Sequence, residues 1–63
     1  MNEMMEYKGY LGSVEFSEED GLFYGRVLEI PALISYEGRN PTELLADFHR
    51  AVEDYLELNS IQT

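Results

Sequence analysis

The 63-residue chain contains no cysteine and no tryptophan. The absence of thiols excludes a disulfide framework and a thiolate metal site, and it fits a reducing compartment. The sequence also lacks an apolar run near the length of about 20 residues that a membrane span requires. Its start, Met1-Asn2-Glu3, lacks the basic region of a signal peptide. We therefore expect a cytoplasmic protein that does not contact membranes.

Basic residues are scarce. Four Lys and Arg residues stand against thirteen Asp and Glu residues, which gives a formal charge of −9 and a pI near 4.2. Such a charge repels phosphate backbones, so direct nucleic-acid binding by this chain is disfavoured. The apolar content of 44% and the aromatic content of 13% exceed those of a disordered acidic tail. Residues 1–63 are long enough for one domain only, and a domain of this size needs a dense core or a partner.

The first part of the chain has the pattern of three strands, over about residues 7–16, 22–30 and 33–37. Asp20-Gly21 predicts the turn between the first two strands, because glycine accepts positive φ. The two glycines inside the expected strands, Gly12 and Gly25, indicate close packing or bulges.

The second expected strand must place one of its two faces toward the core. The inner face is assigned to Phe23, Gly25 and Val27, because the opposite choice would bury the charge of Arg26 without a partner. The outer face then carries Tyr24, Arg26 and Leu28.

A helix is expected over about residues 41–58. Asn40 is suited to the N-cap, Pro41 to the first helical position and Glu43 to a capping box. Residues at helical spacing form one apolar stripe that should pack on the sheet: Leu44, Leu45, Phe48, Ala51, Val52, Tyr55 and Leu56. The fold class is therefore α+β, a small three-stranded antiparallel sheet (β-β-β-α) with one helix across one face.

Large apolar residues occur on both faces of the expected strands, whereas one helix covers only one face. We therefore expect an uncovered apolar patch and free sheet edges, which are typical of interaction surfaces. The candidate protein-binding residues are Tyr24, Arg26 and Leu28 on the outer sheet face and Asp47 and Asp54 on the acidic helix face. That acidic face has two interpretations, a solvated surface or a surface that steers a basic partner.

No motif for catalysis, metal binding or cofactor binding is found in the sequence. His49 is the only histidine, lies at the margin of the apolar stripe and is interpreted as a boundary residue. The acids at 18–20 lack the ligand spacing of an EF-hand, and the glycines do not form a phosphate-binding loop. We expect no catalytic residues, no metal site and no cofactor, and the chain is not expected to be an enzyme.

Several ordered segments resemble HicB antitoxins over nearly the whole chain. They are YKGYLGSVEFSEED at 7–20, FYGRVL at 23–28, LISYEG at 33–38, DFH at 47–49 and AVEDYL at 51–56.

The resemblance implies a partial ribonuclease-H-like fold without catalytic chemistry, which serves as a protein-binding domain. The implied partner is a HicA-like toxin, a small basic RNase that cleaves messenger RNA and whose active or RNA-binding surface the antitoxin masks. HicB proteins usually continue into a DNA-binding domain, but no basic segment follows the expected helix here, so promoter binding by this chain is not expected.

Two alternatives come from other classes. A self-associating module would cover the uncovered patch with a second copy. We expect the chain to form a homo-oligomer. A residual nuclease would need clustered carboxylates and magnesium. Glu15, Glu29 and Glu37 lie near the strands without such a spacing, so the nuclease is disfavoured.

Overall fold

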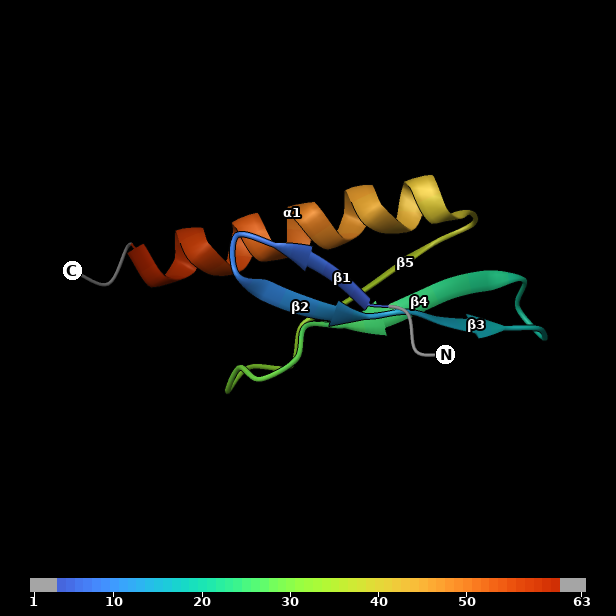
Figure 1. Cartoon of the computed structure of the whole chain (residues 1–63), viewed down its shortest axis with the longest axis horizontal. Helices are drawn as coiled ribbons and strands as arrows, with labels where there is room; N and C mark the ends of the chain where they lie inside the picture. Colours follow the sequence, from blue (N-terminus) through green and yellow to red (C-terminus); the bar gives the residue numbers. More distant parts are fainter. Residues whose placement is uncertain (1–3, 61–63) are drawn as a thin grey trace.

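The computed structural model describes residues 4–60 of the chain and has an α+β fold. Two small antiparallel sheets and one helix make up the structure, with α1 lying across the strands (Figure 1). The first sheet pairs β1 (Met4–Tyr7) with β2 (Tyr10–Ser13), and the second has the order β3 (Glu15–Ser17), β4 (Leu22–Arg26), β5 (Ser35–Gly38). The helix α1 spans Pro41–Ser60. The expected α+β class is confirmed, whereas the single three-stranded sheet is wrong.

The expected first strand over residues 7–16 is wrong because a tight turn interrupts it. Lys8 and Gly9 have φ values of 52° and 84°, and they connect the paired residues Tyr7 and Tyr10. Two successive residues with positive φ form the type of two-residue turn that matches the twist of a hairpin. The chain therefore reverses at Lys8-Gly9, and β1 is an additional strand that the sequence pattern did not predict.

Tyr36 separates the two sheets by interrupting one ladder. Gly12 pairs with Val27 and Glu15 with Tyr24, so the register of the two sheets is continuous. Between these pairs the Tyr36 hydroxyl donates to the backbone carbonyl of Ser13 at 2.8 Å and lies 3.1 Å from that of Arg26.

The Arg26 N–H consequently bonds to the side chain of Ser13, at 3.0 Å from its Oγ. No buried side-chain N or O atom is left without a partner within residues 4–60. The phenol thus takes the place of one ladder contact without leaving buried polar side-chain atoms unsatisfied.

Gly12 and Gly25 provide the space that Tyr36 occupies. A Cβ on Gly12 would overlap the Tyr36 hydroxyl and lie 2.6 Å from Cε1 of Phe48. A Cβ on Gly25 would overlap the carbonyl oxygen of Ser13 and lie 2.9 Å from Cε1 of Tyr36. The expectation that these glycines mark close packing is confirmed.

The second and third strands differ from their expected bounds. Strand β4 ends at Arg26, followed by an isolated bridge at Val27, rather than continuing to residue 30. Glu29 adopts a φ of 62°, which no strand residue adopts, and residues 28–34 form an irregular connection to β5. The third strand consequently begins at Ser35 instead of residue 33 and includes Gly38.

The core lies between α1 and the inner face of the strands. Its buried hydrophobic residues are Val27, Tyr36, Leu44, Phe48, Ala51 and Val52. Gly25 is also buried and Phe23 is half-buried, which confirms the inward face assigned to the second expected strand. Most of the expected helix stripe is confirmed, but Leu45 is 41% exposed, so it lies at the edge of the covered face rather than in the core.

The start of α1 at Pro41 is confirmed together with its caps. Asn40 Oδ1 accepts from the backbone N–H of Glu43 at 2.9 Å, and Glu43 Oε1 accepts from the N–H of Arg39 at 3.0 Å. The second contact differs from a standard capping box, in which the glutamate bonds to the N-cap residue itself. Both contacts satisfy donors close to the start of the helix.

Replacing Asn40 with alanine is expected to lower the free energy of unfolding by about 1 kcal/mol, because the Glu43 N–H loses its acceptor. Urea unfolding followed by circular dichroism measures the change. Thr42→Ala, one residue inside the helix and exposed, is the matched control and should have a smaller effect. Equal effects of the two substitutions would contradict the capping role.

Candidate protein-binding site

The outer face of the three-stranded sheet carries a tyrosine between two carboxylates. Tyr24 pairs with Glu15 on β3 and with Glu37 on β5, so the three side chains point to the same side of the sheet. Tyr24 is 42% exposed, and Arg26 on the same strand is also exposed. The face is therefore mixed in character, and the expected apolar patch is reduced there to Tyr24 and the half-buried Leu22.

Other large apolar side chains are exposed outside this face. Phe16, at 50% exposure, lies on β3 directly opposite Phe23, and Leu33, at 84%, lies in the connection 28–34. Exposed apolar surface is thus present, but it is distributed over several places.

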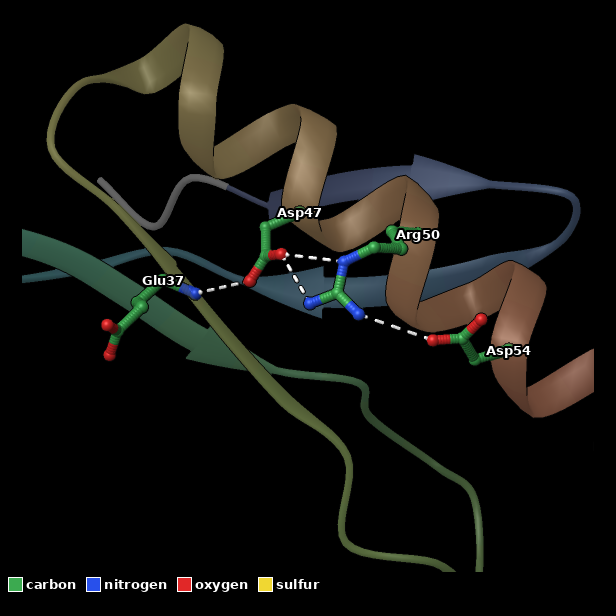
Figure 2. A network of polar contacts seen from close by, with 4 residues as sticks. All are labelled: Glu37, Asp47, Arg50 and Asp54. Carbon is green, nitrogen blue, oxygen red and sulfur yellow. Dashed lines mark hydrogen bonds and ion pairs between the residues drawn. The ribbon is translucent and has the colours of Figure 1, made fainter.

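The helix flank next to β5 holds a polar network centred on Asp47 (Figure 2). Asp47 Oδ2 accepts from the backbone N–H of Glu37 at 3.0 Å, and its Oδ1 accepts from Arg50 Nη2 at 2.6 Å and Nε at 3.1 Å. Arg50 Nη1 also reaches Asp54 Oδ2 at 3.3 Å. Burial disfavours the charged form of Asp47, but the hydrogen bonds from Arg50 and Glu37 outweigh it and keep the pKa of Asp47 below its usual value.

This network covers part of the free edge of β5. An unpaired edge strand exposes N–H and C=O groups that can pair with another chain. The Glu37 N–H already donates to Asp47 on the helix, so it is not available to a partner strand. A partner that binds Asp47 would have to compete with both of its internal donors.

The five candidate residues do not converge on one site. Tyr24 and Asp47 line a shallow hollow that also includes Glu37 and Arg50. Arg26 and the half-buried Leu28 line a second hollow beside the connection 28–34. Asp54 borders a third, near Lys8. The roles of these five residues in binding stay predictions.

A second polar cluster joins the β1–β2 hairpin to α1. The Tyr7 ring stacks on His49 with a centroid distance of 4.0 Å and an interplanar angle of 19°, and its hydroxyl donates to Glu53. Lys8 Nζ lies 2.9 Å from Glu53 Oε2. The hydrogen bonds from Tyr7 and Lys8 lower the pKa of Glu53. Sequence reasoning missed this cluster because the hairpin that brings Tyr7 to the helix was not predicted.

Two of the few bases of the chain are engaged in internal ion pairs. The ion pairs within residues 4–60 involve Lys8 and Arg50, so two of the four bases of the chain are bound to its own acids. The carboxylates at 18–20 are exposed and lie outside these ion pairs. The exposed charge of the described residues is therefore complementary in sign to a basic surface.

Residues 4–60 contain no group of three or more His, Asp or Glu side chains close enough together to hold a metal ion.

Within the described part of the chain, no helix has the length and apolar character needed to cross a membrane.

Comparison of the chain with family models, with curated proteins and with solved structures finds no match in any of the three.

Tyr36 gives the stability a specific dependence on pH. Its burial raises the pKa of the phenol from 10.0 to about 12, and the side chain of Ser13 opposes this increase only in part. Between about pH 10 and pH 12, the Tyr36 phenol loses its proton in the unfolded chain and keeps it in the folded chain. The contribution to stability is thus complete below pH 10 and is lost as the pH rises through about 12.

Tyr36→Phe is expected to remove the loss of stability at alkaline pH that this phenol causes. At neutral pH it should lower the free energy of unfolding by about 1–2 kcal/mol, because the hydrogen bonds of the hydroxyl are lost. Urea midpoints of both proteins, measured from about pH 9 to pH 12, test it. Tyr24→Phe, on the exposed face, is the control. Parallel pH curves for the parent and Tyr36→Phe would contradict the assignment.

Proposed function

We propose that the chain is an antitoxin-like protein-binding domain that inhibits a HicA-like mRNA-cleaving toxin of a type II toxin–antitoxin system. The observation that carries the proposal is the surface charge. Thirteen acids stand against four bases, and two of those bases are held in internal ion pairs. An RNase that binds messenger RNA presents a basic surface, and this chain carries the complementary charge.

The resemblance of the sequence to HicB antitoxins supports the same partner. In this proposal the strands and helix form a partial ribonuclease-H-like domain that works by binding rather than by catalysis. It acts in the cytoplasm, where messenger RNA is the substrate of the toxin.

The inhibition follows from competition for one basic surface. Complementary charge accelerates the encounter between two proteins and disfavours partners of the wrong sign. Once bound, the acidic domain occupies the surface that would otherwise hold RNA. Affinity should therefore fall as salt concentration rises, because screening weakens the attraction between exposed charges.

The test is a titration of the purified chain against a HicA-like toxin encoded beside its gene, with RNA cleavage and binding as the two readouts. We expect stoichiometric inhibition that weakens at high salt. A variant with a less acidic surface tests the role of charge. Glu18→Gln, Glu19→Gln and Asp20→Asn together remove three exposed charges and should slow association without changing the fold. A toxin that is neither bound nor inhibited would refute the proposal.

A self-associating module is the second candidate, and the exposure of Phe16 and Leu33 favours it. Burying these side chains against a second copy would remove apolar surface from water. The net charge of −9 on each copy opposes such an assembly. Light scattering decides, because a monomer at high protein and salt concentration would exclude the module.

A further inference from the structure

Within residues 4–60, the backbone of β3 has one side without a partner strand. The Glu37 N–H donates to Asp47, so Glu37 points away from β4. Hydrogen-bonded and non-hydrogen-bonded pairs alternate along antiparallel strands. Tyr24, which lies opposite Glu37, therefore directs its own backbone groups toward β3 and bonds with Glu15. By the same alternation, the N–H and C=O of Phe16 point away from β4 toward the open edge.

The side chain of Phe16 adds apolar surface to this edge. Its ring packs on Phe23 with a centroid distance of 4.8 Å, yet half of the side chain is exposed. The β3–β4 hairpin extends past the start of α1, so the helix does not cover its far end (Figure 1). Helix α1 packs mainly on β5, with further contacts to β4 and β1.

Acidic residues surround the same edge. Glu15 lies on β3, and Glu18, Glu19 and Asp20 form the turn that follows it; all four are exposed. The ion pairs within residues 4–60 leave these four carboxylates unused. An apolar ring and a pair of free backbone groups are thus flanked by negative charge.

We propose that the free edge of β3 binds a basic, extended segment of a partner protein as an added strand. The choice of a basic partner rests on the proposed function. Free main-chain groups supply affinity in this binding mode, and alternate side chains supply specificity. The segment would place an apolar residue beside Phe16 and lysine or arginine residues beside Glu15 and the acidic turn.

A second copy of the chain fits this edge poorly. Two parallel β3 strands would bring their acidic turns together, and like charges placed opposite each other in a sheet are destabilising. An antiparallel pair centred on Phe16 would place Glu15 opposite Ser17, but it would still join two copies that each carry a net charge of −9. The edge of β5 differs because Asp47 already occupies one of its donors.

The test compares two substitutions at one position. Phe16→Ala removes the ring and keeps the N–H, whereas Phe16→Pro removes both. The N–H of Phe16 is not part of the ladder to β4, and proline is tolerated at such positions on edge strands. The probe is a synthetic peptide of about eight residues in which lysine and valine alternate, with a glutamate–valine peptide as its control.

We expect Phe16→Pro to bind the lysine peptide about tenfold more weakly than Phe16→Ala, because a carbonyl of the peptide loses its donor. The glutamate peptide should not bind. Hydrogen exchange at the Phe16 amide of the unmodified protein gives an independent readout, since this amide should become protected when the peptide binds, even if the proline variant does not fold.

Equal affinity of the two variants, together with an unprotected Phe16 amide, would overturn strand addition. Binding of the glutamate peptide would overturn the basic partner, and light scattering that shows dimers lost in Phe16→Pro would identify a second copy as the occupant. A toxin that binds Phe16→Pro and Phe16→Ala equally well would overturn this inference and leave the proposed function intact. Binding of the peptide without binding of the toxin would leave this inference intact and would refute the proposed function.

Discussion

Replacing Phe48 with alanine is expected to remove a large part of the free energy of unfolding. Phe48 is 0% exposed and is among the largest fully buried side chains of the described residues. Truncating a buried phenylalanine costs about 3–5 kcal/mol through lost burial and the remaining cavity. A chain of this length has a total stability of only about 3–9 kcal/mol. Few other side chains are close enough to refill the space in so small a core.

The contacts of Phe48 explain why the loss is not local. Its ring packs on Tyr36 with a centroid distance of 5.2 Å and lies over the backbone of Gly12. The cavity would thus open beside the hydroxyl that links Ser13 to Arg26. Loss of the ring therefore weakens the core and the junction between the two sheets together.

Urea unfolding followed by circular dichroism measures the effect of Phe48→Ala. Leu45→Ala is the matched control, since Leu45 lies one turn earlier on the same helix and is 41% exposed. It should cost less than about 1 kcal/mol. A Phe48→Ala protein about as stable as Leu45→Ala would show that the helix does not pack as described.

The helix was predictable because its signals are local. Asn40 and Glu43 act within a few residues of their own positions, and the spacing of Leu44, Phe48 and Val52 follows one face. Leu45 satisfies the same periodicity but lies outside the core, because the width of the covered face depends on where the strands lie. Sequence spacing alone does not contain that information.

The strand bounds were less predictable because distant contacts decide them. Residues 7–16 alternate well enough for one strand, and the positive φ of Lys8, which reverses the chain, is unusual for a residue other than glycine. The division between β2 and β3 depends on Tyr36, more than twenty residues away in the sequence. No periodicity in either segment indicates that a tyrosine hydroxyl replaces a ladder contact there.

The candidate site was predictable only in part. The exposure of Tyr24 and Arg26 followed from the choice of inner face, which depends on the cost of burying a charge. The internal engagement of Asp47 was not predictable, because its donor is a backbone N–H of β5. A carboxylate on the polar face of an expected helix is predicted to be exposed, but the sequence does not show which strand edge lies beside it.

Gly25→Ala is expected to have the second large effect on stability. The added Cβ would overlap the carbonyl oxygen of Ser13 and lie 2.8 Å from its carbonyl carbon, while the Tyr36 ring lies 2.9 Å away on another side. A backbone carbonyl held by the Tyr36 hydroxyl has little freedom to move. The methyl group therefore has to separate β4 from the end of β2, which carries Ser13.

We expect Gly25→Ala to cost about 3 kcal/mol, even though alanine in a strand is intrinsically better than glycine by about 0.5–1 kcal/mol. Gly12→Ala should cost less, because Phe48 and the Tyr36 hydroxyl, which its Cβ would meet, belong to side chains. Ser35→Ala, at an exposed position on the adjacent strand, serves as the neutral control. Urea midpoints followed by tyrosine fluorescence rank the three variants. If Gly25→Ala is as stable as Ser35→Ala, the Ser13 carbonyl does not lie over Gly25, and the placement of the Tyr36 hydroxyl between the strands is wrong.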